Sequence, residues 1–333
     1  MMSPNAIDPA LALCLQRFAR LDAQTPTPQL DYSGRRRWLS ELQARLLRSP
    51  LPGVTVQNHF VAAQDREIPV RTYLPAERAS GRTLVWLHGG GWMVGSLDTH
   101  DDLCEHLAHY TGHTVVSVHY RRTPENRFPA PVDDAQAVLQ WLTAMQGLLP
   151  FASARVLLGG DSAGAHLALA TAVRHVQQPA GQPCACIEAL LLLYPCLLPA
   201  QDNESMRSFS QGFGLTATAM QQYWDALGGD NDPLRTPSRC EAALPLLPPV
   251  ALMTASHDIL RDEAEAFARQ LQAVPQGPVT RLQRADGMVH GFARMLNASP
   301  LARQHVEAAC SMLQQIMPAA VHDAGTFSAI THG

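Results

Sequence analysis

Residues 155–170 read RVLLGGDSAGAHLALA and carry the clearest signal of how this chain folds. The first five residues form a short apolar run typical of a buried strand, whereas residues 163–177 have the pattern of a helix. Between the two, Gly160, Ser162 and Gly164 form a Gly-x-Ser-x-Gly motif. A serine on a sharp turn from strand to helix exposes its hydroxyl, and the positive end of the helix favours negative charge there. We therefore predict that Ser162 is a nucleophile.

Short apolar runs alternate with helical segments over most of the chain. Strands are predicted at residues 54–61, 67–74, 83–87, 113–120, 155–159, 188–195, 249–255 and 279–285. Helices are predicted at residues 133–146, 163–177, 261–273 and 301–316. Alternation of this kind is typical of an α/β fold with a mostly parallel central sheet flanked by helices. In such a fold the functional loops gather at the carboxyl ends of the strands.

A serine alcohol needs a base to take its proton, and the base needs an acid to orient it. Asp258 and His290 follow Ser162 in the chain order serine, acid, histidine, which is one of the orders in which such triads occur. Each lies just after a predicted strand, so both are expected at the edge that carries the serine. Two competing acids fit structural roles better: Asp262 is predicted to open a helix, and Asp286 to form a turn.

Residues 88–91 read HGGG and directly follow a predicted strand. Glycine loses more backbone entropy on folding than any other residue, so three in succession indicate that another group approaches the backbone closely. Acyl transfer to a serine creates an oxyanion, which fixed backbone N–H groups stabilise. We predict that Gly90, Gly91 and Ala163 supply these groups. The alternative is a tight turn without a ligand; the glycine spacing excludes a dinucleotide-binding loop.

The composition excludes several kinds of chemistry. All 25 basic residues are arginine, so the chain has no lysine for a phosphate-binding loop, a Schiff base or a Ser-x-x-Lys pair. The net charge of −4 favours neither nucleic acid nor an anionic membrane as a partner. No apolar run is long enough to span a bilayer, the N-terminal stretch is a poor secretory signal, and the seven cysteines lack paired spacing. We therefore expect a cytoplasmic protein.

Two groups of residues could indicate a metal site. His106 and His109 share the face of a predicted helix near Cys104, and Cys184 and Cys186 are separated by one residue. Neither group has the spacing of a known zinc motif, and no second cluster completes either set of ligands. We predict no metal and no cofactor.

Two regions interrupt the alternation of strands and helices. Residues 10–50 contain two amphipathic helix candidates. Residues 200–230 contain a polar loop followed by a helix for which Thr216 is a suitable N-cap. Both regions either cover the functional edge of the sheet or pack as ordinary helices; the pattern alone does not separate these two interpretations.

Five ordered stretches resemble one known family. They are HGGGWMVGSLDTHD (88–101), YRRTPENRFPAPVDDA (120–135), GGDSAGAHLA (159–168), HDILRDE (257–263) and VHGF (289–292). Over roughly residues 50–316 the chain closely resembles the hormone-sensitive-lipase-like esterases, also called bacterial family IV carboxylesterases. The resemblance implies an α/β-hydrolase fold with an N-terminal helical cap, no cofactor, and hydrolysis of short acyl esters by Ser162, Asp258 and His290.

The resemblance also suggests how the chain is divided. The predicted parts are an N-terminal helical cap (1–50), an α/β-hydrolase catalytic domain (51–318) from which 200–230 contributes to the cap, and a flexible tail (319–333). Four bulky residues are predicted to narrow a pocket for short-to-medium acyl chains above Ser162: Trp92, Met93, Phe213 and Met288.

Three alternatives stay open at this point. The same triad would serve an amidase or a deacetylase, because it cleaves amides as well as esters. A non-catalytic small-molecule-binding protein on the same fold is also conceivable, although the presence of His290 in its motif favours an enzyme. A homodimer is compatible with the sequence but not required by it.

Overall fold

The computed structural model describes residues 6–24, 31–78, 82–179 and 184–317, so the predicted tail at 319–333 lies outside the described residues. The strands are β1 (Val54–Ala62), β2 (Glu67–Pro75), β3 (Thr83–Leu87), β4 (Thr114–Val118), β5 (Arg155–Asp161), β6 (Cys186–Leu193), β7 (Val250–His257) and β8 (Thr280–Val289). The α-helices are α1 (Pro9–Gln24), α2 (Tyr32–Leu46), α3 (Asp101–Thr111), α4 (Ala130–Ala144), α5 (Ala163–Gln177), α6 (Glu204–Phe209), α7 (Ala217–Leu227), α8 (Arg261–Ala273) and α9 (Pro300–Ile316).

The strands form one sheet in the order β1-β2-β4-β3-β5-β6-β7-β8. Strand β2 pairs antiparallel with both β1 and β4, and every other neighbouring pair is parallel. The prediction of a mostly parallel central sheet is therefore confirmed. Parallel pairing places the carboxyl ends of β3, β5, β7 and β8 at one edge of the sheet.

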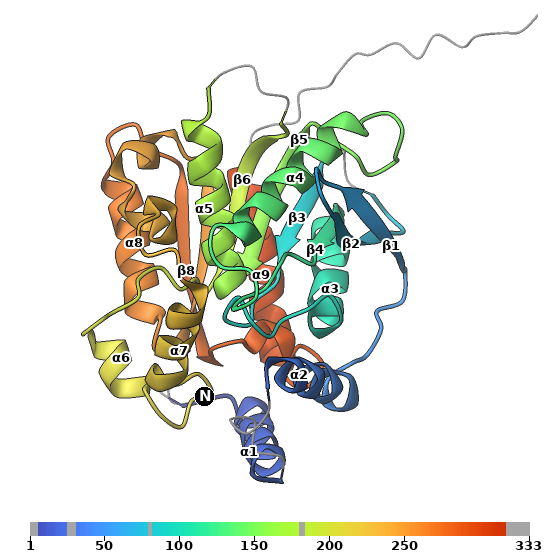
Figure 1. Cartoon of the computed structure of the whole chain (residues 1–333). Helices are drawn as coiled ribbons and strands as arrows, with labels where there is room; N and C mark the ends of the chain where they lie inside the picture. The colour runs from blue at the N-terminus through green and yellow to red at the C-terminus, as the bar shows by residue number, and fades with distance from the viewer. Residues whose placement is uncertain (1–5, 25–30, 79–81, 180–183, 318–333) are drawn as a thin grey trace, which may run out of the picture.

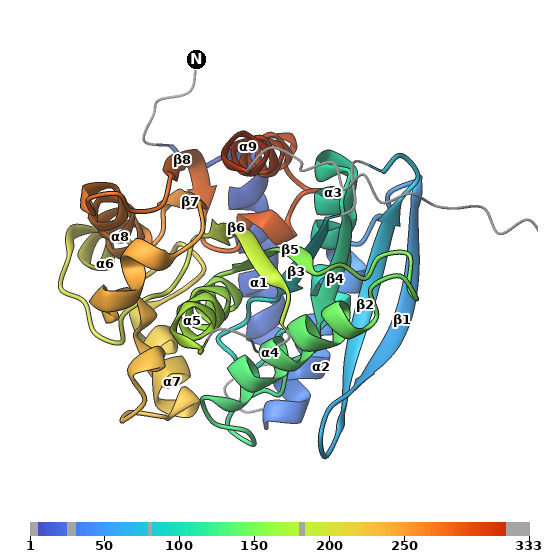
Figure 2. The same cartoon turned by 90° about the horizontal axis from the view of Figure 1, so that it is seen from above.

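Helices cover both faces of the sheet (Figures 1 and 2). The apolar side chains of α4, α5 and α8 pack against one face, and those of α3 and α9 against the other. Strand β3 shows why the sequence folds this way: its side chains alternate between the two cores, with Val85 and Leu87 on one side and Leu84 and Trp86 on the other. A strand that is apolar on both faces can only be stable between two helical layers.

The element boundaries differ from the predicted ones at two informative places. Helix α4 begins at Ala130 rather than at residue 133, because Pro131 is tolerated in the first turn, where its missing N–H would have no partner. Asp286 does not form the predicted turn but lies within β8. There Gly287 takes a φ of 76° and the pairing with β7 shifts register, which is typical of a β-bulge.

Four helices outside the two layers gather at one end of the molecule, the lower end in Figure 1: α1, α2, α6 and α7. Thr216 caps α7 as predicted, since its side chain accepts a hydrogen bond from the N–H of Ala219. Asp8 opens α1 in the same way, because its carboxylate accepts from the N–H of Leu11 at 3.2 Å. Among the helices that the structure describes, none combines the length and the apolar character needed to cross a membrane.

Candidate active site

Ser162 lies on the tight turn between β5 and α5, with φ 55° and ψ −120°. The two glycines of the motif make this turn possible. A β-carbon on Gly160 would lie 2.3 Å from the carbonyl carbon of Gly164, and one on Gly164 would lie 1.8 Å from the carbonyl oxygen of Leu87. Both contacts are far too short for any side chain, so the motif glycines are needed for packing between backbones.

The partners of Ser162 come from two neighbouring strands. His257, the last residue of β7, pairs with Val289, the last residue of β8. The residues that follow, Asp258 and His290, therefore leave the sheet side by side. The Nδ1 atom of His290 lies 2.7 Å from the Oδ2 atom of Asp258, and its Nε2 atom lies 2.8 Å from the Oγ atom of Ser162.

These contacts define which atoms of Asp258, His290 and Ser162 donate hydrogen bonds and which accept them. A carboxylate can only accept, so Nδ1 of His290 carries a proton and donates a hydrogen bond to Asp258, which leaves Nε2 free to accept a hydrogen bond from Ser162. The second oxygen of Asp258 accepts from the N–H of Leu260 at 3.0 Å. Asp258 is 1% exposed and Ser162 is 8% exposed, so bulk water hardly competes for these bonds.

The loop after β3 packs against the turn that carries Ser162, because the N–H of Gly89 donates to Asp161, the residue before the serine. Its glycines take positive φ values, 112° at Gly90 and 58° at Gly91, which other residues adopt only at a cost. Within the described part of the chain, the backbone N–H groups of Gly90, Gly91 and Ala163 have no hydrogen-bond acceptor. Ala163 is the first residue of α5, whose positive end lies at the same place. These three N–H groups are free to bind a ligand oxygen.

Sequence reasoning missed a buried pair beneath this loop. The carboxylate of Asp161 accepts a hydrogen bond from the N–H of Gly89 at 3.0 Å and lies 3.1 Å from Nε2 of His100. Burial raises the pKa of Asp161, but the contact with His100 and the bond from Gly89 outweigh it, so the pKa lies below its ordinary value. Asp161 thus joins the serine turn to the glycine loop. Its position within the serine motif was the only sequence signal.

Two of the four predicted pocket residues are buried in the core. Trp92 is fully buried: its indole N–H donates to Nδ1 of His166 at 3.2 Å, and its ring packs against Trp224 with centroids 4.6 Å apart. This anchor stabilises the backbone of Trp92, which takes a φ of 58°. Met288 is fully buried as well. Neither side chain is exposed, and their role in a pocket stays a prediction.

The other two predicted pocket residues lie closer to the cap. Phe213 is partly buried and stacks on the ring of His257, with centroids 5.6 Å apart. Met93 is 3% exposed and lies on the glycine loop itself. No sequence pattern pointed to Tyr223, from α7, whose ring covers Gly91: a β-carbon on that glycine would lie 2.4 Å from the ring.

A buried carboxylate lies behind the loop of Asp258. Glu263 accepts a hydrogen bond from the N–H of Leu197 at 2.7 Å through one oxygen, and its other oxygen has no partner among the described residues. Burial, with the nearby charge of Asp258, raises the pKa of Glu263 to about 8. The carboxyl group is therefore mostly neutral at pH 7.

The competing acid Asp262 and the histidine considered as a metal ligand, His106, have other partners. Asp262 is in the first turn of α8, as predicted, and its carboxylate accepts from the N–H of Ser205 at 2.7 Å. His106 bonds to the carbonyl oxygen of Asp102 in its own helix. In the ranges that the structure describes, no three histidine, cysteine or acidic side chains are arranged to hold a metal ion.

Comparisons with known proteins agree with this architecture. The family model described as an alpha/beta hydrolase fold matches residues 84–294. The carboxylic ester hydrolase LipN of Mycobacterium tuberculosis is 32% identical over 308 residues, which cover 87% of this chain and 78% of that protein. An ethyl acetate hydrolase of Pseudomonas putida is 34% identical over 235 residues, which cover 68% of this chain and 72% of that protein.

A solved structure extends the match to almost the whole chain. The crystal structure of a thermostable esterase from Pseudomonas putida ECU1011 superposes with a TM-score of 0.85 and 27% identity, covering 96% of this chain and all of that one. The match therefore takes in the helices at the carboxyl edge of the sheet as well as the sheet itself. The chain belongs to the α/β-hydrolase family, among its hormone-sensitive-lipase-like carboxylesterases.

Proposed function

We propose that the protein hydrolyses short-to-medium acyl esters by an acyl-enzyme mechanism in which Ser162 is the nucleophile, His290 the base and Asp258 the residue that orients it. The observation that supports this most is the unbroken chain of hydrogen bonds from Asp258 through His290 to Ser162, with lengths of 2.7 and 2.8 Å. This geometry is what activation of a serine alcohol requires.

In the first half of the reaction, Nε2 of His290 takes the proton of Ser162 while Oγ attacks the ester carbonyl carbon. The carbonyl oxygen becomes an oxyanion, which the N–H groups of Gly90, Gly91 and Ala163 stabilise. When the tetrahedral intermediate collapses, His290 gives its proton to the departing alcohol, and the acyl group stays on Oγ.

Water completes the cycle by the same steps. His290 takes a proton from the water as its oxygen attacks the acyl carbonyl, and the proton then returns to Oγ as the acid leaves. Asp258 keeps Nδ1 protonated and stabilises the imidazolium that forms in each half. No step needs a metal or a cofactor, and we expect EDTA to leave the rate unchanged; loss of activity on chelation with recovery on adding zinc would contradict this.

The proposed substrate range follows from the surroundings of Ser162. Tyr223 covers the glycine loop and Phe213 packs on His257 beside the acid, so the cap residues lie close to the serine. A small acyl group fits such a site better than a long one. The relative from Pseudomonas putida is named an ethyl acetate hydrolase, which fits the same preference.

The test combines labelling and turnover. We expect a fluorophosphonate probe to label the wild-type protein at Ser162, and p-nitrophenyl acetate to be hydrolysed. The variant Ser162→Ala should neither be labelled nor turn the ester over above the rate of the uncatalysed reaction. Labelling at another residue, or residual turnover by the variant near the wild-type rate, would rule out the proposed nucleophile.

A further inference from the structure

One side chain of the cap reaches the glycine loop directly. Arg36, on α2, donates from Nε to the carbonyl oxygen of Met93 at 2.8 Å, two residues after Gly91. One of its terminal nitrogens donates to the carbonyl oxygen of Thr123 at 2.9 Å. Both terminal nitrogens also bind the carboxylate of Glu125, at 2.8 and 2.7 Å. Arg36 thus joins the cap to two core loops that lie side by side.

Other carbonyl groups of the glycine loop also accept hydrogen bonds, two of them from residues outside the loop. The carbonyl oxygen of Trp92 accepts from the N–H of Thr123 at 3.0 Å, and that of Gly95 accepts from Arg122 at 2.8 Å. The carbonyl oxygen of Gly90 closes the turn, accepting from the N–H groups of Met93 and Val94. The carbonyl of one residue and the N–H of the next lie in one rigid peptide plane, so fixing the carbonyl of Met93 fixes the N–H of Val94, and fixing that of Gly90 fixes the N–H of Gly91.

We propose that Arg36 is a positioning residue for the oxyanion loop: its guanidinium holds the peptide that joins Met93 to Val94. Through the bond from the N–H of Val94 to the carbonyl oxygen of Gly90, it holds the N–H group of Gly91 in the geometry that the transition state needs. This inference rests on the oxyanion role given to the two glycines in the proposed function. The cap is then part of the catalytic apparatus and not merely a cover over it.

The contact needs an arginine. Its planar fork serves the Met93 carbonyl, the Thr123 carbonyl and the carboxylate of Glu125 at once, which a lysine ammonium on a flexible stem cannot do. Glu125 is 51% exposed, so the ion pair contributes little to stability in water. Its effect is to orient the guanidinium, whose side chain is only 17% exposed.

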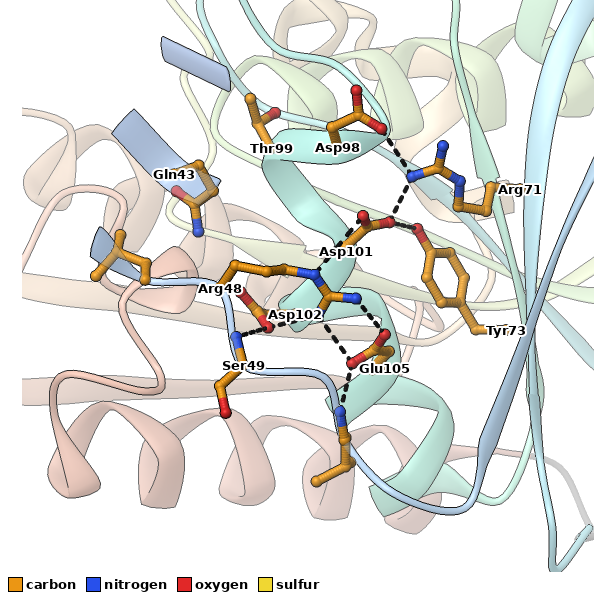
Figure 3. A network of polar contacts seen from close by, with 12 residues as sticks. Gln43, Arg48, Ser49, Arg71, Tyr73, Asp98, Thr99, Asp101, Asp102 and Glu105 are labelled. Atoms are coloured by element: carbon orange, nitrogen blue, oxygen red, sulfur yellow. Dashed lines mark hydrogen bonds and ion pairs between the residues drawn. The ribbon is translucent and has the colours of Figure 1, made fainter. Parts of the chain in front are cut away.

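The other end of the same helix offers a matched control. Arg48, just after α2, binds the carboxylates of Asp102 and Glu105 on α3, both at 2.7 Å (Figure 3). This cluster also attaches the cap to the core through an arginine. The guanidinium of Arg48 binds carboxylates there, whereas that of Arg36 binds two backbone carbonyl groups as well as a carboxylate. The contacts of the Arg48 guanidinium are to α3 and not to the glycine loop. Loss of Arg48 therefore removes a contact between cap and core while it leaves every contact of Arg36 in place.

The experiment compares Arg36→Gln with Arg48→Gln, using p-nitrophenyl acetate. We expect kcat of Arg36→Gln to fall by about 10- to 100-fold, since misplacing a group by about 1 Å can cost 10²-fold. KM should stay within about twofold, because the oxyanion forms only in the transition state. Arg48→Gln should keep kcat within about threefold. Affinity for a trifluoromethyl ketone, which forms the same oxyanion on Ser162, should fall in parallel with kcat/KM in Arg36→Gln alone.

Chemical rescue separates positioning from folding. A cavity of about 340 Å³ lined by Arg36, Tyr120, Arg122 and Glu125 lies beside the contact. Guanidinium, added at concentrations far below denaturing ones, should therefore recover part of the kcat that Arg36→Ala has lost. The same addition should not change the kcat of Arg48→Ala. Only folded protein can be rescued in this way. Recovery of kcat would therefore show that the loss in Arg36→Ala comes from the missing guanidinium, even if the variant has a lowered Tm.

Three results would overturn the inference: equal losses of kcat in the Arg36 and Arg48 variants, a rise in KM with unchanged kcat, or no rescue in folded Arg36→Ala. These outcomes are distinct from failure of the proposed function, which Ser162→Ala reports in the same assay. If Ser162→Ala is inactive and Arg36→Gln is fully active, only the positioning role of Arg36 is refuted.

Discussion

Ser162 keeps its hydroxyl in place through a strained backbone. Its φ of 55° and ψ of −120° lie outside the regions that residues other than glycine usually occupy, which costs about 1–3 kcal/mol. The strain persists because Gly160 and Gly164 let three backbone segments meet at the turn, and because the N–H of Ser162 donates to the carbonyl oxygen of Leu193 at 2.8 Å. The neighbours of Ser162 thus hold its side chain in the one position that the proposed attack on a carbonyl carbon requires.

The triad side chains should act as one unit. We expect Ser162→Ala and His290→Ala each to abolish nearly all hydrolysis, and the double variant to cost little more, because each change alone already prevents nucleophilic attack. Asp258→Asn should lower kcat by up to about 10⁴, through the wrong tautomer of the histidine. Steady-state kinetics on p-nitrophenyl acetate measure all four variants. A larger loss in Asp262→Asn or Asp286→Asn than in Asp258→Asn would contradict the choice of acid.

Glu263 should make stability depend on pH. Its pKa rises from an ordinary value near 4.5 to about 8 in the folded state, mainly through burial. The folded protein therefore binds the proton more tightly, and this contribution to stability is complete below about pH 4.5 and is lost as the pH rises to about 8. We expect the difference in Tm between Glu263→Gln and the wild type, measured by calorimetry, to shift by several degrees in favour of the variant between pH 5 and pH 9. A pH-independent difference in Tm would show that the wild-type carboxyl does not titrate in this range.

Helix α7 limits the space over the glycine loop through Tyr223. The ring lies where a β-carbon on Gly91 would have to go, 2.4 Å away. A helix from the cap thus bears on the residue whose N–H group is proposed to bind the oxyanion. The loop itself has no room to yield, because Trp92 is anchored in the core.

Gly91→Ala should lower kcat/KM by about 10-fold or more, because either the loop or Tyr223 must move. Tyr223→Ala removes the obstacle, so the double variant should be more active than the sum of the two separate losses implies. A double-mutant cycle on kcat/KM, with Gly53→Ala as a control at a glycine with open space, measures the coupling. Additive losses would mean that the two residues do not contact each other in solution.

The cap touches the core at each catalytic loop. Arg36 holds the glycine loop, Gln43 donates to the carbonyl oxygen of Arg294 beyond His290 at 2.9 Å, and Ser205 donates to that of Ile259 next to Asp258 at 2.9 Å. Figure 1 shows α2 and α6 on opposite sides of this edge. The cap helices therefore contact all three loops of the proposed site.

The contacts of the cap helices with the three loops of the proposed site predict a limit on the length of the acyl chain. Each added methylene should gain about 0.8 kcal/mol while it fits and lose more once it forces overpacking. We expect kcat/KM for p-nitrophenyl esters to peak at short chains, around two to eight carbons, and to fall toward palmitate. A maximum at palmitate, or a jump in rate above the micelle concentration, would instead indicate a true lipase with an open groove.

Much of this architecture could be read from local patterns. Hydrophobic periodicity predicts strands β3 and β5 and the bounds of helices α5 and α8. The serine turn between β5 and α5 follows from glycines that no other residue can replace. Such features depend on residues a few positions apart. The turn predicted at Asp286 was wrong for the same reason: the residue lies within β8 where the pairing with β7 shifts register, and only contacts between the two strands determine that.

Contacts between distant residues depended on the folded chain. Arg36 and Met93 are 57 positions apart, and His100 and Asp161 are 61 apart. No periodicity links such pairs, because their meeting requires the sheet order, the placement of the cap and the packing of whole helices. The sequence therefore contained the type and order of the reactive groups. The tertiary structure alone determined which side chains hold the glycine loop, because hydrogen bonds across that distance form only once the layers have packed.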